Sequence, residues 1–201
     1  GPLVQFYGFE YESDIPVSGN YWPINVHSDK AIVKDINGDG VINDLDRVVL
    51  GQPPPKFIWG LTNTFEIKNF DVSFVLQGSH GASVFNADPN YYETQFAATG
   101  TNAYLNLPAE LRKRVKYKTE TSYSVEDASF IALRSLNIGY KIPAKFLGKN
   151  NNYLRVYASA FNLWYKFADG YSSYNPEGIN EYTDDPLRNG YQRGAAPITR
   201  N

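Results

Sequence analysis

The feature that most constrains the fold is an alternation of apolar and polar residues on both sides of a two-residue connection. Residues 57–67 and 70–78 each alternate with a period of two, and Lys68 and Asn69 separate them. A period of two is typical of a β-strand with one apolar face. A two-residue connection containing Asn suits a tight turn, because Asn tolerates a positive φ. The sequence therefore predicts an antiparallel hairpin with unusually long strands.

The turn also predicts which residues lie opposite each other. One face takes the pairs Ile67–Phe70, Phe65–Val72, Asn63–Phe74 and Leu61–Leu76, with Trp59 at its far end. The other face takes Glu66–Asp71, Thr64–Ser73, Thr62–Val75 and Gly60–Gln77. The first face is almost wholly apolar and the second is polar. Glu66 opposite Asp71 is unfavourable, since like charges across a strand pair repel, and we expect water and Lys68 to offset it.

Two more long strands are predicted, at 129–142 and 153–164. The alternation in the first fails at Arg134, which indicates a β-bulge there or a strand that continues beyond a membrane. A short helix is expected at 109–115, after Pro108. The remaining long segments, 79–128 and 165–197, are aromatic and irregular in pattern.

Composition excludes several classes of function. The 201 residues contain no Cys and two His, His27 and His80, and the formal net charge is −2. Without Cys the chain has no disulfide, zinc–thiolate site or thiol nucleophile. The near-neutral charge gives no support to a nucleic-acid partner. No window approaches 18 apolar residues, so a helical membrane span is not expected. No Ser, His or carboxylate arrangement points to catalysis, and we predict that the protein is not an enzyme.

Two architectures compete for the alternating strands. A soluble β-sandwich buries one face of each sheet, whereas an outer-membrane β-barrel turns that face to lipid and keeps its polar face in a hydrated lumen. In an up-and-down meander the short connections at 68–69 and 143–152 fall on one side and both long segments on the other. That asymmetry is typical of outer-membrane barrels. An aromatic content of 15% with a mean hydropathy of −0.43 also fits a barrel.

Several stretches of the chain read together as a pattern: 5–8, 35–46, 49–57, 70–79, 129–140, 154–157, 162–163 and 174–177, the last being Tyr-Asn-Pro-Glu. These stretches resemble SusC/RagA-type TonB-dependent outer-membrane transporters and occur in the order in which that family has them. The resemblance covers nearly the whole chain. It implies an all-β, antiparallel up-and-down transmembrane barrel, of which 1–201 is a C-terminal part without the plug domain or the last strand. The absence of Met fits such an internal piece.

The resemblance also implies a function and partners. The expected function is TonB-dependent import of oligosaccharides or peptides across the bacterial outer membrane. The expected partners are a SusD-like surface lipoprotein, TonB acting through the absent N-terminal region, the substrate and the lipid bilayer. The family barrel has about 22 strands. The alternative is a secreted, calcium-stabilised β-sandwich that binds carbohydrate.

Residues 35–46 match the pattern of a calcium-binding loop. Oxygen ligands would come from positions 1, 3, 5, 7, 9 and 12 of the loop, which are Asp35, Asn37, Asp39, the carbonyl of Val41, Asn43 and Asp46. Gly40 permits the sharp turn at position 6, while Asp46 is shorter than the usual Glu at position 12. The sequence predicts a structural Ca²⁺ site here, and a metal-free turn built from Asp and Asn side chains is the alternative.

The long segments carry aromatic residues that could stack on sugar rings or on peptide side chains. The candidates are Tyr91, Tyr92, Trp164 and Tyr174. An aromatic girdle at the membrane surface, or packing of the loops on themselves, is the alternative role. The basic run at 112–118 is expected to be a solvated face of an outer loop.

Overall fold

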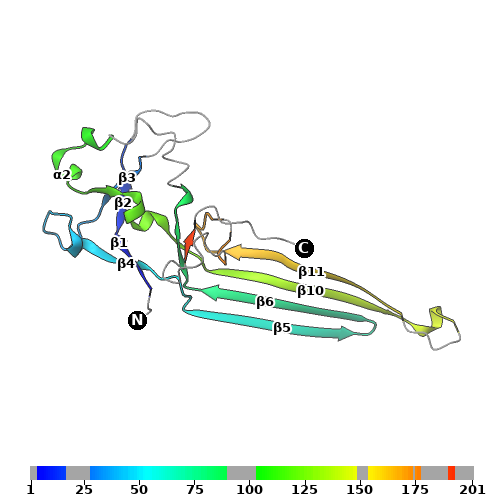
Figure 1. Ribbon diagram of the computed structural model, residues 1–201. Helices are drawn as coiled ribbons and strands as arrows, with labels where there is room; N and C mark the ends of the chain where they lie inside the picture. The colour runs from blue at the N-terminus through cyan, green and yellow to red at the C-terminus, as the bar shows by residue number, and fades with distance from the viewer. Residues whose placement is uncertain are drawn as a thin grey trace.

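The computed structural model describes residues 4–16, 28–89, 103–148, 154–173, 175–177 and 190–192. A twisted sheet of four long strands dominates it, and three small sheets gather at one end of that sheet (Figure 1). The long strands are β5 (Phe57–Ile67), β6 (Phe70–His80), β10 (Phe130–Ile142) and β11 (Leu154–Phe167). Their order across the sheet is β11-β10-β6-β5, with every neighbour antiparallel. The predicted all-β class is confirmed.

The predicted hairpin is confirmed residue by residue. Ile67 pairs with Phe70, Glu66 with Asp71, and the ladder continues without a shift to Phe57 opposite His80. The positive φ falls on Lys68, at 55°, and not on Asn69 as the residue types indicated. The first position of the turn takes the left-handed conformation here, so the strand geometry overrides the side-chain preference.

The predicted irregularity at Arg134 is a β-bulge that widens from strand to strand. Leu133 pairs with Leu76 and Ser135 with Val75, which leaves Arg134 as one extra residue relative to β6. On β11 the same interval spans Trp164 to Phe161. Asn162 takes a φ of 49° within that interval. The bulge restores the alternation beyond it, so the same face of all four strands stays apolar.

That apolar face is exposed over most of its area. Side chains from all four strands contribute to it, among them Phe57, Trp59, Leu61, Phe65, Ile67, Phe70, Ile131, Ile138, Leu154, Val156 and Trp164, each at least 36% exposed. Within the described residues, no second layer covers this face. The opposite face is mostly polar, although Ile58, Tyr157 and Phe161 are also exposed there.

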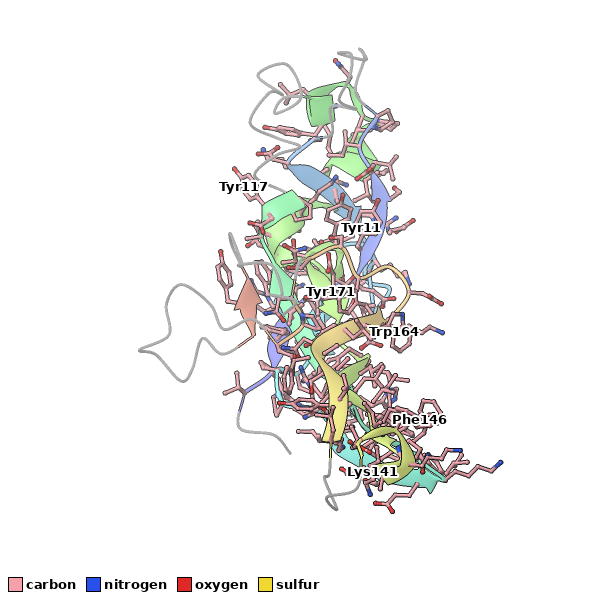
Figure 2. The ribbon with its side chains drawn as sticks, turned by 90° about the vertical axis from the view of Figure 1, so that its right-hand side faces the viewer. Tyr11, Tyr117, Lys141, Phe146, Trp164 and Tyr171 are labelled. Carbon is pink, nitrogen blue, oxygen red and sulfur yellow. The ribbon has the colours of Figure 1, made fainter. Side chains whose placement is uncertain are left out.

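The two short connections lie at the same end of the long sheet. The Lys68–Asn69 turn and the β10–β11 connection both lie at the right in Figure 1, and the small sheets lie at the left. Figure 2 views the molecule from the turn end, with Lys141 and Phe146 low in the picture and Tyr11 and Tyr117 higher. The predicted sorting of short and long connections to opposite ends is confirmed.

The segments outside the long strands are more regular than the sequence indicated. The small strands are β1 (Phe6–Phe9), β2 (Tyr11–Asp14), β3 (Lys30–Val33), β4 (Arg47–Gly51), β7 (Ser83–Asn86), β8 (Val115–Tyr117), β9 (Val125–Asp127) and β12 (Tyr191–Gln192). They form the sheets β1-β4, β2-β3-β8 and β12-β7-β9, with β12 and β7 parallel. Much of the core lies here, in Phe9, Ile15, Ala31, Ile32, Val33 and Val84.

In the described ranges, helical structure is confined to short turns. α2 (Ala109–Arg112) is shorter than the predicted helix, because Val115 already begins β8. The 3-10 turns are Asp44–Asp46, Ala103–Asn106, Lys118–Glu120, Ser122–Ser124 and Ala144–Phe146. None of the helices in the described ranges is long and apolar enough to cross a membrane.

The basic run at 112–118 is the expected solvated face only in part: Arg112 and Lys113 are exposed, Arg114 and Lys116 are half-buried, and Lys118 is buried. Arg114 donates to the carbonyl of Val33 from Nε and Nη2, at 3.0 and 2.8 Å, and pairs with Glu12. Lys116 lies 4.9 Å above the Phe9 ring. Lys118 is fully buried and pairs with Asp14 at 2.8 Å. These alternate cations tie β8 to its neighbours, since a buried charge must be paired.

The packing of the apolar face can be tested by substitution at Gly78. A side chain at Gly78 would overlap the Trp59 indole, whereas one at Gly60 would meet only the Leu76 carbonyl oxygen, at 3.9 Å. We expect Gly78→Ala to lower the free energy of unfolding of the full-length protein by about 1–3 kcal/mol through overpacking. Gly60→Ala is the matched control and should change it by less than half as much. Urea titration followed by tryptophan fluorescence measures both, and equal effects would contradict this packing.

Candidate functional site

The polar face of the long sheet carries an ion pair near its turn end. Arg155 on β11 reaches across β10 to Asp71 on β6, with Nε 3.0 Å from Oδ1 and Nη2 bonded to Oδ2. Gly139 lies between them on β10, and a side chain there would clash with both groups. Arg155 therefore neutralises Asp71 directly and offsets its repulsion from Glu66, while the expected contribution of Lys68 stays a prediction.

A larger polar cluster surrounds Arg134 near the opposite end of the same face. Its guanidinium donates from Nε to Gln77 Oε1 at 2.7 Å and from Nη1 to the Tyr165 hydroxyl at 2.5 Å. Nη2 pairs with Glu177. The Tyr165 hydroxyl also donates to Glu177 Oε2, at 3.2 Å. The bulge thus directs Arg134 to the polar face, where its planar guanidinium joins β6, β11 and the segment that contains Glu177.

Glu177 belongs to a segment that is tied down at both ends. At its start the Ser172 hydroxyl donates to Glu126 at 2.6 Å, the Ser172 N–H donates to the other Glu126 oxygen at 3.0 Å, and Asn86 Nδ2 contacts both residues. We call residues 170–173 and 175–177 the strap. It lies over the polar face where the long strands meet the small sheets, and it places the Asn175-Pro-Glu177 motif against the sheet. Sequence reasoning found the odd Arg134 and the motif but not their contact.

The predicted calcium loop folds around its own side-chain oxygens. Asp35 accepts from the N–H groups of Gly38 and Gly40, both at 2.7 Å. Asp39 accepts from Val41 N at 2.7 Å. The side-chain oxygen of Asn43 caps the 3-10 turn by accepting from Leu45 N at 2.8 Å. Both glycines have a positive φ, of 75° and 81°, which a tight loop of this kind requires.

Asp46 closes the loop. It is fully buried, and its two oxygens accept from Ile36 N and Asn43 N, each at 2.9 Å. The Asn43 N–H, with help from those of Ile36 and Asn37, holds the pKa of the Asp46 carboxyl below its usual range, although burial acts against it. Asp46 is therefore a carboxylate at neutral pH, buried beneath the loop.

The loop offers oxygen ligands of the type that Ca²⁺ prefers. In the part of the chain that the structure describes, no group of three or more His, Cys, Asp or Glu side chains is arranged to hold a metal ion. The carboxylate oxygens of Asp35, Asp39 and Asp46 instead accept hydrogen bonds from the loop itself. The calcium site stays a prediction.

Of the aromatic candidates for substrate binding, the structure describes Trp164 alone. Tyr91, Tyr92 and Tyr174 lie outside the described residues. Trp164 lies within β11 opposite Leu133, on the apolar face, and is 48% exposed. That position favours its alternative role in an aromatic girdle, while its role in substrate binding stays untested.

Comparison with known proteins gives the architecture a context. No protein-family model matches the chain. TonB-dependent receptor P3 of Formosa agariphila is 32% identical over 215 residues, which cover 97% of this chain and 21% of the receptor. TonB-dependent receptor SusC of Bacteroides thetaiotaomicron is 31% identical over 140 residues, covering 64% of this chain and 14% of SusC.

The chain is a SusC/RagA-like segment. Solved structures of the RagAB peptide importer share its fold: the open-open state superposes with a TM-score of 0.59 at 18% identity, over 98% of this chain and 21% of that chain. The chain spans about one fifth of the length of TonB-dependent receptor P3. The resemblance predicted from the sequence is confirmed. The relatives are named as receptors and not as enzymes, in agreement with the prediction.

Arg134→Lys should release the strap of this SusC/RagA-like segment. Lysine keeps the charge but cannot bond Gln77, Tyr165 and Glu177 together, because it lacks the planar fork. We expect amide hydrogen exchange in residues 170–177 of the full-length protein to quicken by about tenfold, which corresponds to about 1.4 kcal/mol of local opening free energy. Arg155→Lys is the matched control at the other end of the polar face. Strap exchange that does not respond to Arg134→Lys would refute the tie.

Calcium binding is tested on the same protein. If the loop holds Ca²⁺, millimolar CaCl₂ should slow amide exchange in 35–46 by about tenfold, because an ion bound only by the folded loop stabilises it. The effect should vanish in Asp39→Ala and persist in Asp44→Ala, whose side chain is not among the predicted ligands. Exchange that is insensitive to CaCl₂ would leave the metal-free turn as the explanation.

Proposed function

We propose that this chain is part of the barrel wall and outer loops of an outer-membrane, TonB-dependent importer. The observation that carries the proposal is the long sheet, with one exposed apolar face, one polar face and two open edges. Its strands have the length that a tilted transmembrane strand needs, about 9–11 residues. The relatives named as TonB-dependent receptors support the same assignment.

The apolar face has the layout of a lipid-facing surface. Trp59 and Trp164 lie toward the loop end of the long sheet, which is the end where the small sheets gather. Phe70 and Tyr140 pack against each other at the turn end, with ring centroids 4.6 Å apart. Between them lie aliphatic side chains such as Leu61 and Val72, together with Phe65 and Phe74, whose ring centroids are 6.1 Å apart. Tryptophan and tyrosine near the two ends of an apolar face suit the two surfaces of a membrane.

The open edges support a continued barrel. In the described residues, β5 and β11 each pair on one side only. In lipid an unpaired strand edge costs several kcal/mol for each unsatisfied group, so neighbouring strands must cover it. The chain spans about one fifth of its receptor relatives, and the rest of the parent chain would supply them. Closure into about 22 strands with a plug domain belongs to this proposal.

Substrate and partners follow from the same assignment. The polar face would line the lumen, with TonB energising import from the periplasmic side. A SusD-like lipoprotein would cap the loops at the outer surface, as the two-part name RagAB suggests by analogy. RagAB is named a peptide importer, and the substrate proposed here is an oligopeptide or an oligosaccharide. We further propose that Ca²⁺, bound by residues 35–46, stiffens one outer loop.

The secreted β-sandwich is the weaker alternative. A sandwich needs a second sheet against the apolar face, and none covers it among the described residues. The receptor relatives also match nearly the whole chain, not an isolated module.

Single cysteines test which face meets lipid. This segment has no cysteine of its own, so Leu61→Cys and Thr62→Cys, with cysteines elsewhere in the full-length protein replaced, give adjacent probes on opposite faces. Each variant is labelled with bimane and placed in liposomes. Acyl-chain nitroxide lipids should quench the bimane fluorescence of Leu61→Cys at least threefold more than that of Thr62→Cys, since successive side chains alternate between faces. Equal quenching, or a parent protein that needs no detergent, would contradict the proposal.

Import assays test the transport step and its substrate class. Cells that carry the gene should take up labelled oligosaccharides or oligopeptides, and the uptake should fall to background when the gene or TonB is deleted. Uptake of only one class identifies the substrate. Uptake that is independent of TonB would overturn the energised mechanism.

A further inference from the structure

A shallow pocket opens on the apolar face at the loop end of the long sheet. All four long strands or their immediate extensions line it, through Phe57, Trp59, His80, Ser129, Ile131 and Lys166. Trp59 lies over Gly78, where the missing side chain leaves room for the indole. The pocket thus combines an aromatic and aliphatic wall with four polar side chains, those of Ser79, His80, Ser129 and Lys166.

Lys166 is the unusual residue of this pocket. It is opposite Ile131 in the β10–β11 ladder, which places it on the apolar face two residues beyond Trp164. Its side chain is exposed, and among the described residues it has no ion-pair partner. A lysine that projects from an apolar surface next to tryptophan is suited to the boundary between hydrocarbon and polar headgroups.

The other polar groups point to an anionic ligand. His80 is exposed, and its ring packs 5.1 Å from that of Phe57. The Ser129 hydroxyl already donates to Asp127 and accepts from the Gly81 N–H. Lys166 and His80 are the two basic side chains of the pocket, and both can donate hydrogen bonds. A headgroup phosphate matches the charge of Lys166 and can accept hydrogen bonds from both.

We propose that this pocket binds a phosphate-bearing lipid of the outer leaflet. The phosphate contacts Lys166 and His80, and the first part of an acyl chain lies against Trp59 and Ile131. The inference rests on the proposed function, because it requires the apolar face to meet lipid and the loop end to lie outside. It adds a specific lipid contact on the outer wall, separate from the route of the substrate.

The test uses the full-length transporter purified in dodecyl maltoside. Native mass spectrometry measures the binding of monophosphoryl lipid A and of the same lipid after enzymatic removal of its phosphate. We expect the phosphorylated lipid to bind about tenfold more tightly, because a charge-assisted hydrogen bond contributes on that order. Lys166→Ala should remove this preference, and Lys166→Arg should restore it. Lys68→Ala, in the turn at the opposite end, is the matched control and should leave it intact.

Other outcomes separate the two parts of the pocket. Trp59→Ala should weaken the binding of both lipids by a similar factor, since the substitution removes apolar contact and no charge. Equal binding of the two lipids by the unaltered protein, or an undiminished preference in Lys166→Ala, would overturn the inference and leave Lys166 as an ordinary interface lysine. If acyl-chain nitroxide lipids still quench Leu61→Cys, such a result contradicts the lipid-binding inference and leaves the proposed function standing. Loss of that quenching would overturn both the inference and the proposed function.

Discussion

The pleat of the long strands is the constraint on which the rest of the structure depends. The two-residue turn at Lys68–Asn69 sets one register for β5 and β6, and each later strand adds to that ladder. A slip by one residue would exchange the apolar and polar faces. The bulge at Arg134 meets the same constraint, because it absorbs extra residues and restores the alternation on either side. The apolar surface is therefore continuous across four strands.

The polar face is held together by arginines that reach past their nearest neighbours. Arg155 bonds Asp71 two strands away, through the space left by Gly139. Arg134 joins the sheet to the strap through Glu177. Planar guanidinium groups suit such sites because each offers several fixed donors. In a transporter these ties would keep the lumen wall rigid and position one outer segment above it, while the wall stays hydrated.

The small sheets show how the segments outside the long strands build a core from few apolar residues. Phe9, Ile32 and Val33 are buried there, and the cations of β8 and the following turn complete the packing. Lys116 covers an aromatic ring and Lys118 pairs with Asp14. A run of charges that appears solvated in the sequence is thus partly internal, with Lys118 buried and Arg114 and Lys116 half-buried, since successive side chains of a strand point to different neighbours.

The sequence by itself determined the long strands, the register of the β5–β6 hairpin, the position of the bulge and the sorting of connections, because these follow from a period of two and a short turn. It also carried the family resemblance. Only the tertiary structure decided that Arg155 offsets Asp71, that Glu177 meets Arg134 and that Lys166 faces the same pocket as Trp59. Those contacts join residues far apart in the chain, at distances that strand order and bulge geometry set, and a local pattern holds no record of which strands become neighbours.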